Sequence, residues 1–180
     1  MKKIVLFFSF IFLSQFASAT QLDLEPGTWS LGGRFAVPYK YDRIGRQTLS
    51  FHEEPEVSFF VTDSIRLVAS LEFQMTLRWS RVYPATVGRL TWGGKFGAEY
   101  LFDTGIGLYP YTGAKLGVRI QNIMFDRAQT LVEVPLGILW AMNEHVALNF
   151  AMPVEISFTK FFNFEDVSIA PGYFGAIAFF

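Results

Sequence analysis

Apolar and polar residues alternate along the segment Asp103–Arg119, which reads DTGIGLYPYTGAKLGVR. Of the seven alternate residues from Ile106 to Val118, six are apolar and none is charged. The positions between them hold glycines, tyrosines, Lys115 and, at the end, Arg119. A period of two indicates a β-strand, and this one greatly exceeds the ~5–6 residues usual in soluble sheets. Such a length suits a tilted membrane strand, which needs about 9–11 residues to cross the hydrocarbon.

The same pattern recurs along the chain with a period of about 40 residues. Short turn signals occur at residues 62–64, 103–105 and 143–145, and longer polar connections lie near 40–49, 80–88, 121–129 and 159–166. The expected strands are 28–39, 50–61, 65–79, 89–102, 106–120, 130–141, 146–158 and 167–180. This repeat predicts an all-β fold, an eight-stranded antiparallel up-and-down transmembrane β-barrel.

The N-terminal residues 1–19 have the pattern of a secretory signal peptide. Lys2 and Lys3 precede the apolar run Ile4–Phe16, and Ala17–Ala19 would allow cleavage before Thr20. We therefore expect the barrel domain to span residues 20–180. The chain has no cysteine, and no apolar run after residue 19 is long enough for a transmembrane helix.

Alternation alone does not say which face is inside. Lipocalins are eight-stranded barrels with an apolar interior, and the triplet Gly27-Thr28-Trp29 is similar to their first strand. Here, however, the apolar face is uncharged across the middle strands, whereas the polar face is rich in glycine and mixes both charges. A narrow polar interior would suit such a face. The expected lumen ion network consists of Arg34, Glu56, Arg66, Glu72, Lys95, Glu99, Lys115, Glu133 and Glu155.

Large aromatic residues gather at the two ends of the expected strands, as in the interfacial girdles of membrane barrels. One girdle comprises Trp29, Phe59, Phe102, Trp140 and Phe179, and the other Tyr39, Trp79, Trp92 and Phe158. The sequence ends in Phe180 and resembles the small outer-membrane barrels of the OmpX and OmpA type, whose last strand ends in Phe. It departs from them at Ala178, where an aromatic residue is usual.

The resemblance implies a bacterial outer-membrane location, insertion by the barrel assembly machinery, and long loops that face outward. We expect a monomer with a structural, envelope-interacting role that contacts outer-membrane lipid and lipopolysaccharide, with no nucleic acid, cofactor or metal. Basic residues near the outer loops include Arg43, Arg46, Arg81 and Arg127, whereas the tight-turn end has only acidic charges. Because the guanidinium fork matches phosphate, these four arginines are the predicted lipopolysaccharide-binding rim.

Two other functions remain open. Pro110, Pro135, Pro153 and Pro171 fall within expected strands, and each removes a ladder hydrogen bond. A lateral opening that admits a small hydrophobic molecule or lipid, as in the OmpW-like barrels, is the second hypothesis. Lipid A-modifying catalysis is the third, since His52 lies near Ser50 and Glu54 and a histidine can activate a serine. We do not expect an enzyme.

Overall fold

The computed structural model describes residues 21–41, 47–79, 86–121, 127–159, 163–169 and 172–180. The expected signal peptide, residues 1–19, lies outside this part. The described strands are β1 (Trp29–Ala36), β2 (Tyr39–Tyr41), β3 (Gln47–Phe60), β4 (Ile65–Trp79), β5 (Thr86–Leu101), β6 (Leu108–Gln121), β7 (Arg127–Val134), β8 (Leu136–Asn143), β9 (Val146–Ala151), β10 (Val154–Thr159), β11 (Asn163–Ile169) and β12 (Tyr173–Phe179). The described residues contain no apolar helix of bilayer-spanning length.

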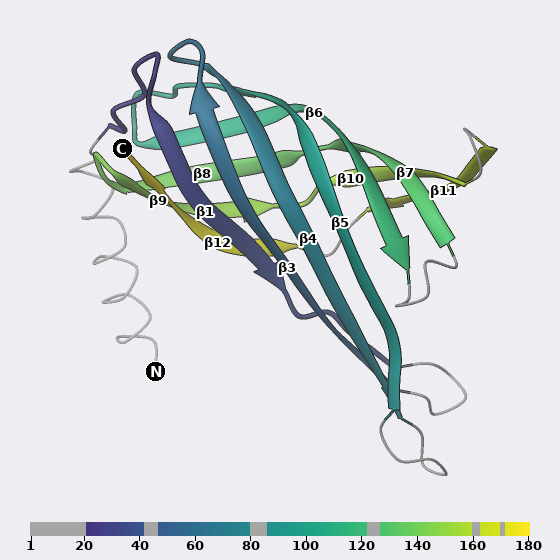
Figure 1. The fold of residues 1–180 in the computed structure, drawn as a ribbon. Coiled ribbons are helices and arrows are strands. Elements are labelled where there is room, and N and C mark those ends of the chain that lie inside the picture. The colour runs from purple at the N-terminus through teal and green to yellow at the C-terminus, as the bar shows by residue number, and fades with distance from the viewer. Residues whose placement is uncertain (1–20, 42–46, 80–85, 122–126, 160–162, 170–171) are drawn as a thin grey trace, which may run out of the picture.

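Eight of these strands form a closed antiparallel ring in the order β1-β3-β4-β5-β6-β8-β9-β12, with β12 paired to β1 (Figure 1). The predicted eight-stranded barrel is therefore confirmed. Several predicted strands are each divided in two. Pro135 separates β7 from β8, and Pro153 lies in the gap between β9 and β10, because proline has no N–H to donate to a ladder. Pro171 lies outside the described residues, and Pro110 stays within β6.

The wall divides toward the end opposite the tight turns. Residues 108–112 of β6 pair with β8, and residues 115–121 of the same strand pair with β7. Beyond β7 lie β10 and then β11, which diverge from the long strands β3, β4 and β5 in Figure 1. The ladder between β1 and β12 ends at Phe35 and Phe174. Within the described residues, β2 pairs with β3 and β11 pairs with β10, and nothing joins β2 to β11.

The predicted long loops were wrong in length. Strand β3 begins at Gln47, β5 at Thr86, β7 at Arg127 and β11 at Asn163, so pairing continues into segments expected to be loops. Backbone hydrogen bonds to the neighbouring strand explain this, since even polar residues join a ladder that a hairpin already holds in register. What remains of these connections lies outside the described residues.

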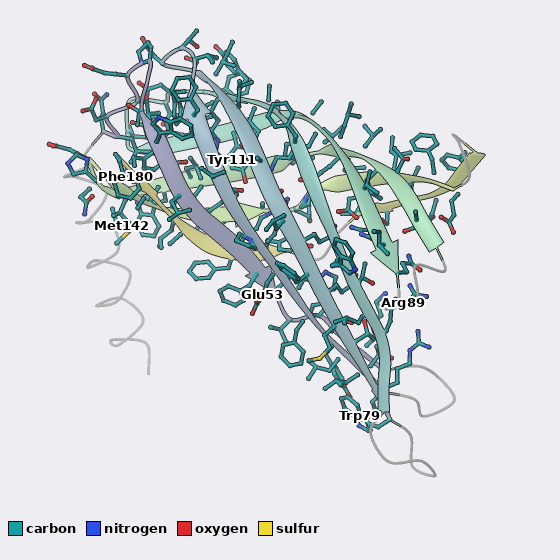
Figure 2. All side chains as sticks on the ribbon, viewed as in Figure 1. Glu53, Trp79, Arg89, Tyr111, Met142 and Phe180 are labelled. Atoms are coloured by element: carbon teal, nitrogen blue, oxygen red, sulfur yellow. The ribbon has the colours of Figure 1, made fainter. Side chains whose placement is uncertain are left out.

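The two faces of the wall follow the predicted alternation. Outward positions are apolar and exposed, including Leu116, Val118 and Trp29, whereas the inward positions of the same strands are enclosed. Phe179 was wrongly assigned to the outer girdle. It is 2% exposed, whereas Phe180 is 75% exposed (Figure 2). Phe179 pairs with Ser30, whose buried side chain faces inward, and the register places Phe179 beside it in the lumen.

The closing ladder between β6 and β8 supplies a test of packing. A Cβ at Gly137 would overlap the ring of Tyr111, its partner across this ladder. We expect Gly137→Ala to lower the free energy of unfolding by about 1–3 kcal/mol, as overpacking does, measured by urea unfolding in detergent micelles. Gly94→Ala is the matched control, because its Cβ would meet Ser70 O only at 3.7 Å. Equal stability of the two variants would contradict this packing.

Candidate functional site

Charged side chains from seven of the strands fill the middle of the barrel. The basic members are Arg34, Arg66, Lys95, Lys115 and Arg119, and the acidic members are Glu54, Glu56, Glu72, Glu99, Glu133 and Glu155. Most of these side chains are almost completely enclosed. Buried charges are costly unless they are paired, and each member of this set has at least one partner of opposite charge.

Lys95 of β5 lies at the centre of this lumen network. Its Nζ is 3.0 Å from Glu155 Oε1, 3.3 Å from Glu54 Oε2 and 3.7 Å from Glu72 Oε2, and it also contacts Glu133. These four carboxylates come from β10, β3, β4 and β7. A single ammonium group therefore links strands on both sides of the lumen.

Arginines connect the remaining carboxylates. Arg34 Nη2 is 2.9 Å from Glu54 Oε2 and 2.6 Å from Glu133 Oε1, which joins β1 to β3 and β7. Arg119 Nη2 lies 2.6 Å from Glu72 Oε1 and 2.8 Å from Glu155 Oε2. Its side chain is 14% exposed, the most accessible in the network. The network is thus most accessible at Arg119.

A second group of charges comes from β3, β4, β5 and β6. Arg66 Nη2 is 2.6 Å from Glu99 Oε2 and 3.5 Å from Glu56 Oε1. Lys115 Nζ is 2.9 Å from Glu99 Oε1 and 3.9 Å from Glu133 Oε1. Glu133 therefore connects this group to the Lys95 centre.

Glycines make room for these long side chains. Across the ladder between β5 and β6, Lys95 pairs with Gly117, Gly97 with Lys115, Glu99 with Gly113, and Gly93 with Arg119. Each inward charge of this ladder therefore faces a residue without a side chain. The glycine-rich polar face of the sequence has its physical explanation here, since glycine leaves space for the long charged side chain opposite it in a barrel this narrow.

All nine residues of the predicted network lie on the inward face and take part in ion pairs. The network predicted from the sequence omitted Glu54 and Arg119. Glu54 has the same parity as Glu56 on β3 and could have been found by extending the alternation past Pro55. The prediction failed because His52-Glu53-Glu54 reads as a solvated polar run.

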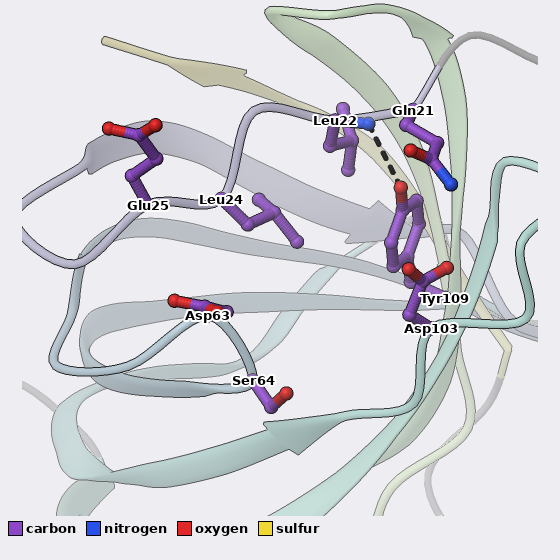
Figure 3. Close-up of a pocket in the computed structure, with 8 residues that line it drawn as sticks. All are labelled: Gln21, Leu22, Leu24, Glu25, Asp63, Ser64, Asp103 and Tyr109. Atoms are coloured by element: carbon purple, nitrogen blue, oxygen red, sulfur yellow. Dashed lines mark hydrogen bonds between the residues drawn. The ribbon is translucent and has the colours of Figure 1, made fainter.

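The tight-turn end of the lumen is apolar. Leu22 and Leu24 pack among inward residues such as Phe60 and Phe179. The backbone N–H of Leu22 donates to the Tyr109 hydroxyl at 2.9 Å (Figure 3). The N-terminal segment of the described chain is therefore folded across this mouth of the barrel.

A pocket of about 380 Å³ lies beside this segment. Its lining residues include the carboxylates of Glu25, Asp63 and Asp103 (Figure 3). Within the described part of the chain, no group of three or more His, Cys, Asp or Glu residues is arranged to hold a metal ion. The three carboxylates therefore do not make a metal centre.

The other predicted site residues are not brought together. Ser50 Oγ lies 3.3 Å from Thr76 Oγ1, and His52 Nδ1 lies 3.4 Å from the Tyr173 hydroxyl. The described hydrogen bonds of Ser50 and His52 thus go to other residues and not to each other. Of the four rim arginines, Arg43, Arg46 and Arg81 lie outside the described residues, and Arg127 begins β7 with its side chain outside them.

No protein-family model and no curated protein matches the sequence. Among solved structures, the chain is similar to Neisserial surface protein A (NspA), with a TM-score of 0.50 and 16% sequence identity. The match covers 85% of this chain and 96% of that one. At this identity the likeness concerns the fold, and it agrees with the ring of eight antiparallel strands, the fold expected from the resemblance to small outer-membrane barrels.

The adjacent residues Glu53 and Glu54 provide a matched test of the network. Glu54→Gln should lower the free energy of unfolding by about 3 kcal/mol, because Arg34 and Lys95 would each lose one charged partner in a buried site. Glu53→Gln should not lower it, since Glu53 is exposed on the outer face. Urea unfolding in micelles, followed by tryptophan fluorescence, measures both. Equal losses in the two variants would contradict the assignment of the faces.

Proposed function

We propose that the protein is an integral barrel of the bacterial outer membrane with a structural, envelope-interacting role. The observation that carries this proposal is the inverted polarity of the wall, with exposed apolar residues outside and enclosed ion pairs inside. In water, such a surface of Leu, Phe and Trp side chains would drive aggregation. In a bilayer the same surface is solvated by lipid, and a closed ring of strands satisfies the backbone.

The proposed contact with lipopolysaccharide rests on charge asymmetry. Arg43, Arg46, Arg81 and Arg127 belong to the connections opposite the tight turns or adjoin them, whereas the tight-turn end carries Glu25, Asp63, Asp103 and Glu144. With the tight turns toward the periplasm, the arginines meet the outer leaflet. That leaflet presents phosphate groups, for which guanidinium is a bidentate donor.

Neutralising the rim tests this role. A variant with Arg43, Arg46, Arg81 and Arg127 all replaced by Gln is expected to retain less lipopolysaccharide on purification. Added lipopolysaccharide should also raise its unfolding temperature much less than that of the wild type, because a ligand stabilises the folded protein only to the extent that it binds it. The control is Glu25→Gln, Asp63→Asn and Glu144→Gln combined, which changes charge at the opposite end. If a folded rim variant retained as much lipopolysaccharide as the wild type, the assignment of these four arginines as a lipopolysaccharide-binding rim would be wrong.

A second candidate function is lateral access for a small hydrophobic molecule. Its support is the seam beyond Phe35 and Phe174, where the described residues of β2 and β11 have no ladder between them. Arg119, the most accessible network residue, and half-buried His52 belong to the lumen at this level. An apolar molecule that entered here would leave the bilayer without crossing a hydrogen-bonded wall.

A disulfide across the seam tests lateral access in this cysteine-free chain. Continued register from Phe35 and Phe174 would bring Val37 opposite Gly172. Oxidised Val37→Cys/Gly172→Cys is expected to bind an apolar fluorescent dye several-fold more weakly than its reduced form. Leu31→Cys/Ala178→Cys is the control, because these residues already pair within the closed ladder and oxidation there should change nothing. Equal dye binding before and after closure of the seam would exclude this route.

A further inference from the structure

A row of aromatic residues crosses the outer face of the barrel and is interrupted by one carboxylate. Successive ladder pairs run from Phe150 to Phe174, Phe35, Glu53, Phe73 and Trp92, on β9, β12, β1, β3, β4 and β5. The aromatic members are each between 41% and 49% exposed. Glu53 projects from the outer side of β3 (Figure 2). Its two neighbours across the ladders are Phe35 and Phe73.

Glu53 has no counter-charge from its own chain within the described residues. It belongs to none of their ion pairs, which all lie in the lumen. No Lys or Arg with a described side chain occupies an outward position of the strands. A second copy of the barrel, packed by this outer face, would therefore bring apolar side chains and not a cation.

The position of Glu53 along the strand places it inside the apolar band. It precedes Phe60, the last residue of β3, by seven positions. At ~3.4 Å per residue and a tilt near 40°, this corresponds to about 18 Å from the tight-turn end of an apolar band about 25 Å tall. Glu53 therefore lies about 7 Å from the interface on the side of the long connections, near the level of the lipid headgroups there. An ionisable residue on a lipid-facing surface calls for a named partner.

We propose that Glu53, Phe35 and Phe73 form a lipid-facing site for the ammonium headgroup of a membrane lipid. The carboxylate accepts a charge-assisted hydrogen bond from the ammonium. The flanking rings attract the same cation through their faces and exclude water from the pair. The lipid chains lie along the apolar wall, so a lipid with an amine headgroup binds more tightly than a free amine does. This site is distinct from the arginine rim, because its sign of charge is opposite and it lies on the wall.

Native mass spectrometry of the full barrel tests the proposal. Phosphatidylethanolamine, its N-acetylated form and phosphatidylglycerol, all with the same acyl chains, are offered in equal amounts. The wild-type barrel should retain phosphatidylethanolamine about tenfold more than the N-acetylated lipid, as expected for about 1.4 kcal/mol of headgroup recognition. Glu53→Gln should abolish this preference. Glu144→Gln, at an exposed turn, should leave it intact.

Further arms separate the sources of the cation. Phe35→Leu and Phe73→Leu should weaken the preference several-fold while the carboxylate remains. Millimolar ethanolamine should not displace the bound lipid, and displacement at that concentration would overturn the lipid assignment in favour of a free amine. A preference that survives in folded Glu53→Gln would overturn the site. An unchanged lipid preference in Glu53→Gln together with a change in its oligomeric state would also overturn the site, because Glu53 would then belong to a contact with a second copy of the barrel.

Discussion

The ammonium of Lys95 lies within 4 Å of carboxylates from four strands, and the arrangement of the wall depends on this charge. If any of these strands slipped by one residue, its glutamate would turn outward into lipid and a buried cation would lose a partner. A one-residue slip reverses every side chain of a strand, and an unpaired buried charge costs several kcal/mol. The ion network therefore selects one register for strands that are otherwise apolar on one face and rich in small residues on the other.

The prolines are the second influence on the wall, after the ion network. Pro135 and Pro153 interrupt neighbouring strand pairs, so that β8 and β9 remain in the closed ring while β7 and β10 continue into the diverging group. Because these breaks are adjacent, the sheet can change direction there without leaving a series of mismatched hydrogen bonds. The result is a barrel closed near the tight turns, with a free edge on β11 at the other end of its described part.

Much of this architecture followed from local pattern. The strands from Ile65 to Trp79 and from Leu108 to Gln121 were predicted within one or two residues, because a long period-two alternation has few other interpretations. The nine lumen charges were found by parity. Glu54 was missed because polarity alone does not separate it from Glu53, and Phe179 was misplaced because an aromatic strand end suits either face. In both cases the partner across the ladder decides the direction of the side chain.

The sequence by itself determined that the chain alternates with a period of two, that one face is uncharged, and that the other carries paired charges and glycine. These are local properties, and each can be read within a single strand. Only the tertiary structure decided which charges meet, where the ring closes, and that Glu53 is isolated among aromatic residues on the outer wall. These features depend on register between different strands, such as β1 with β12 and β3 with β4, and that register is set by contacts between strands, which leave no trace in the pattern of one strand.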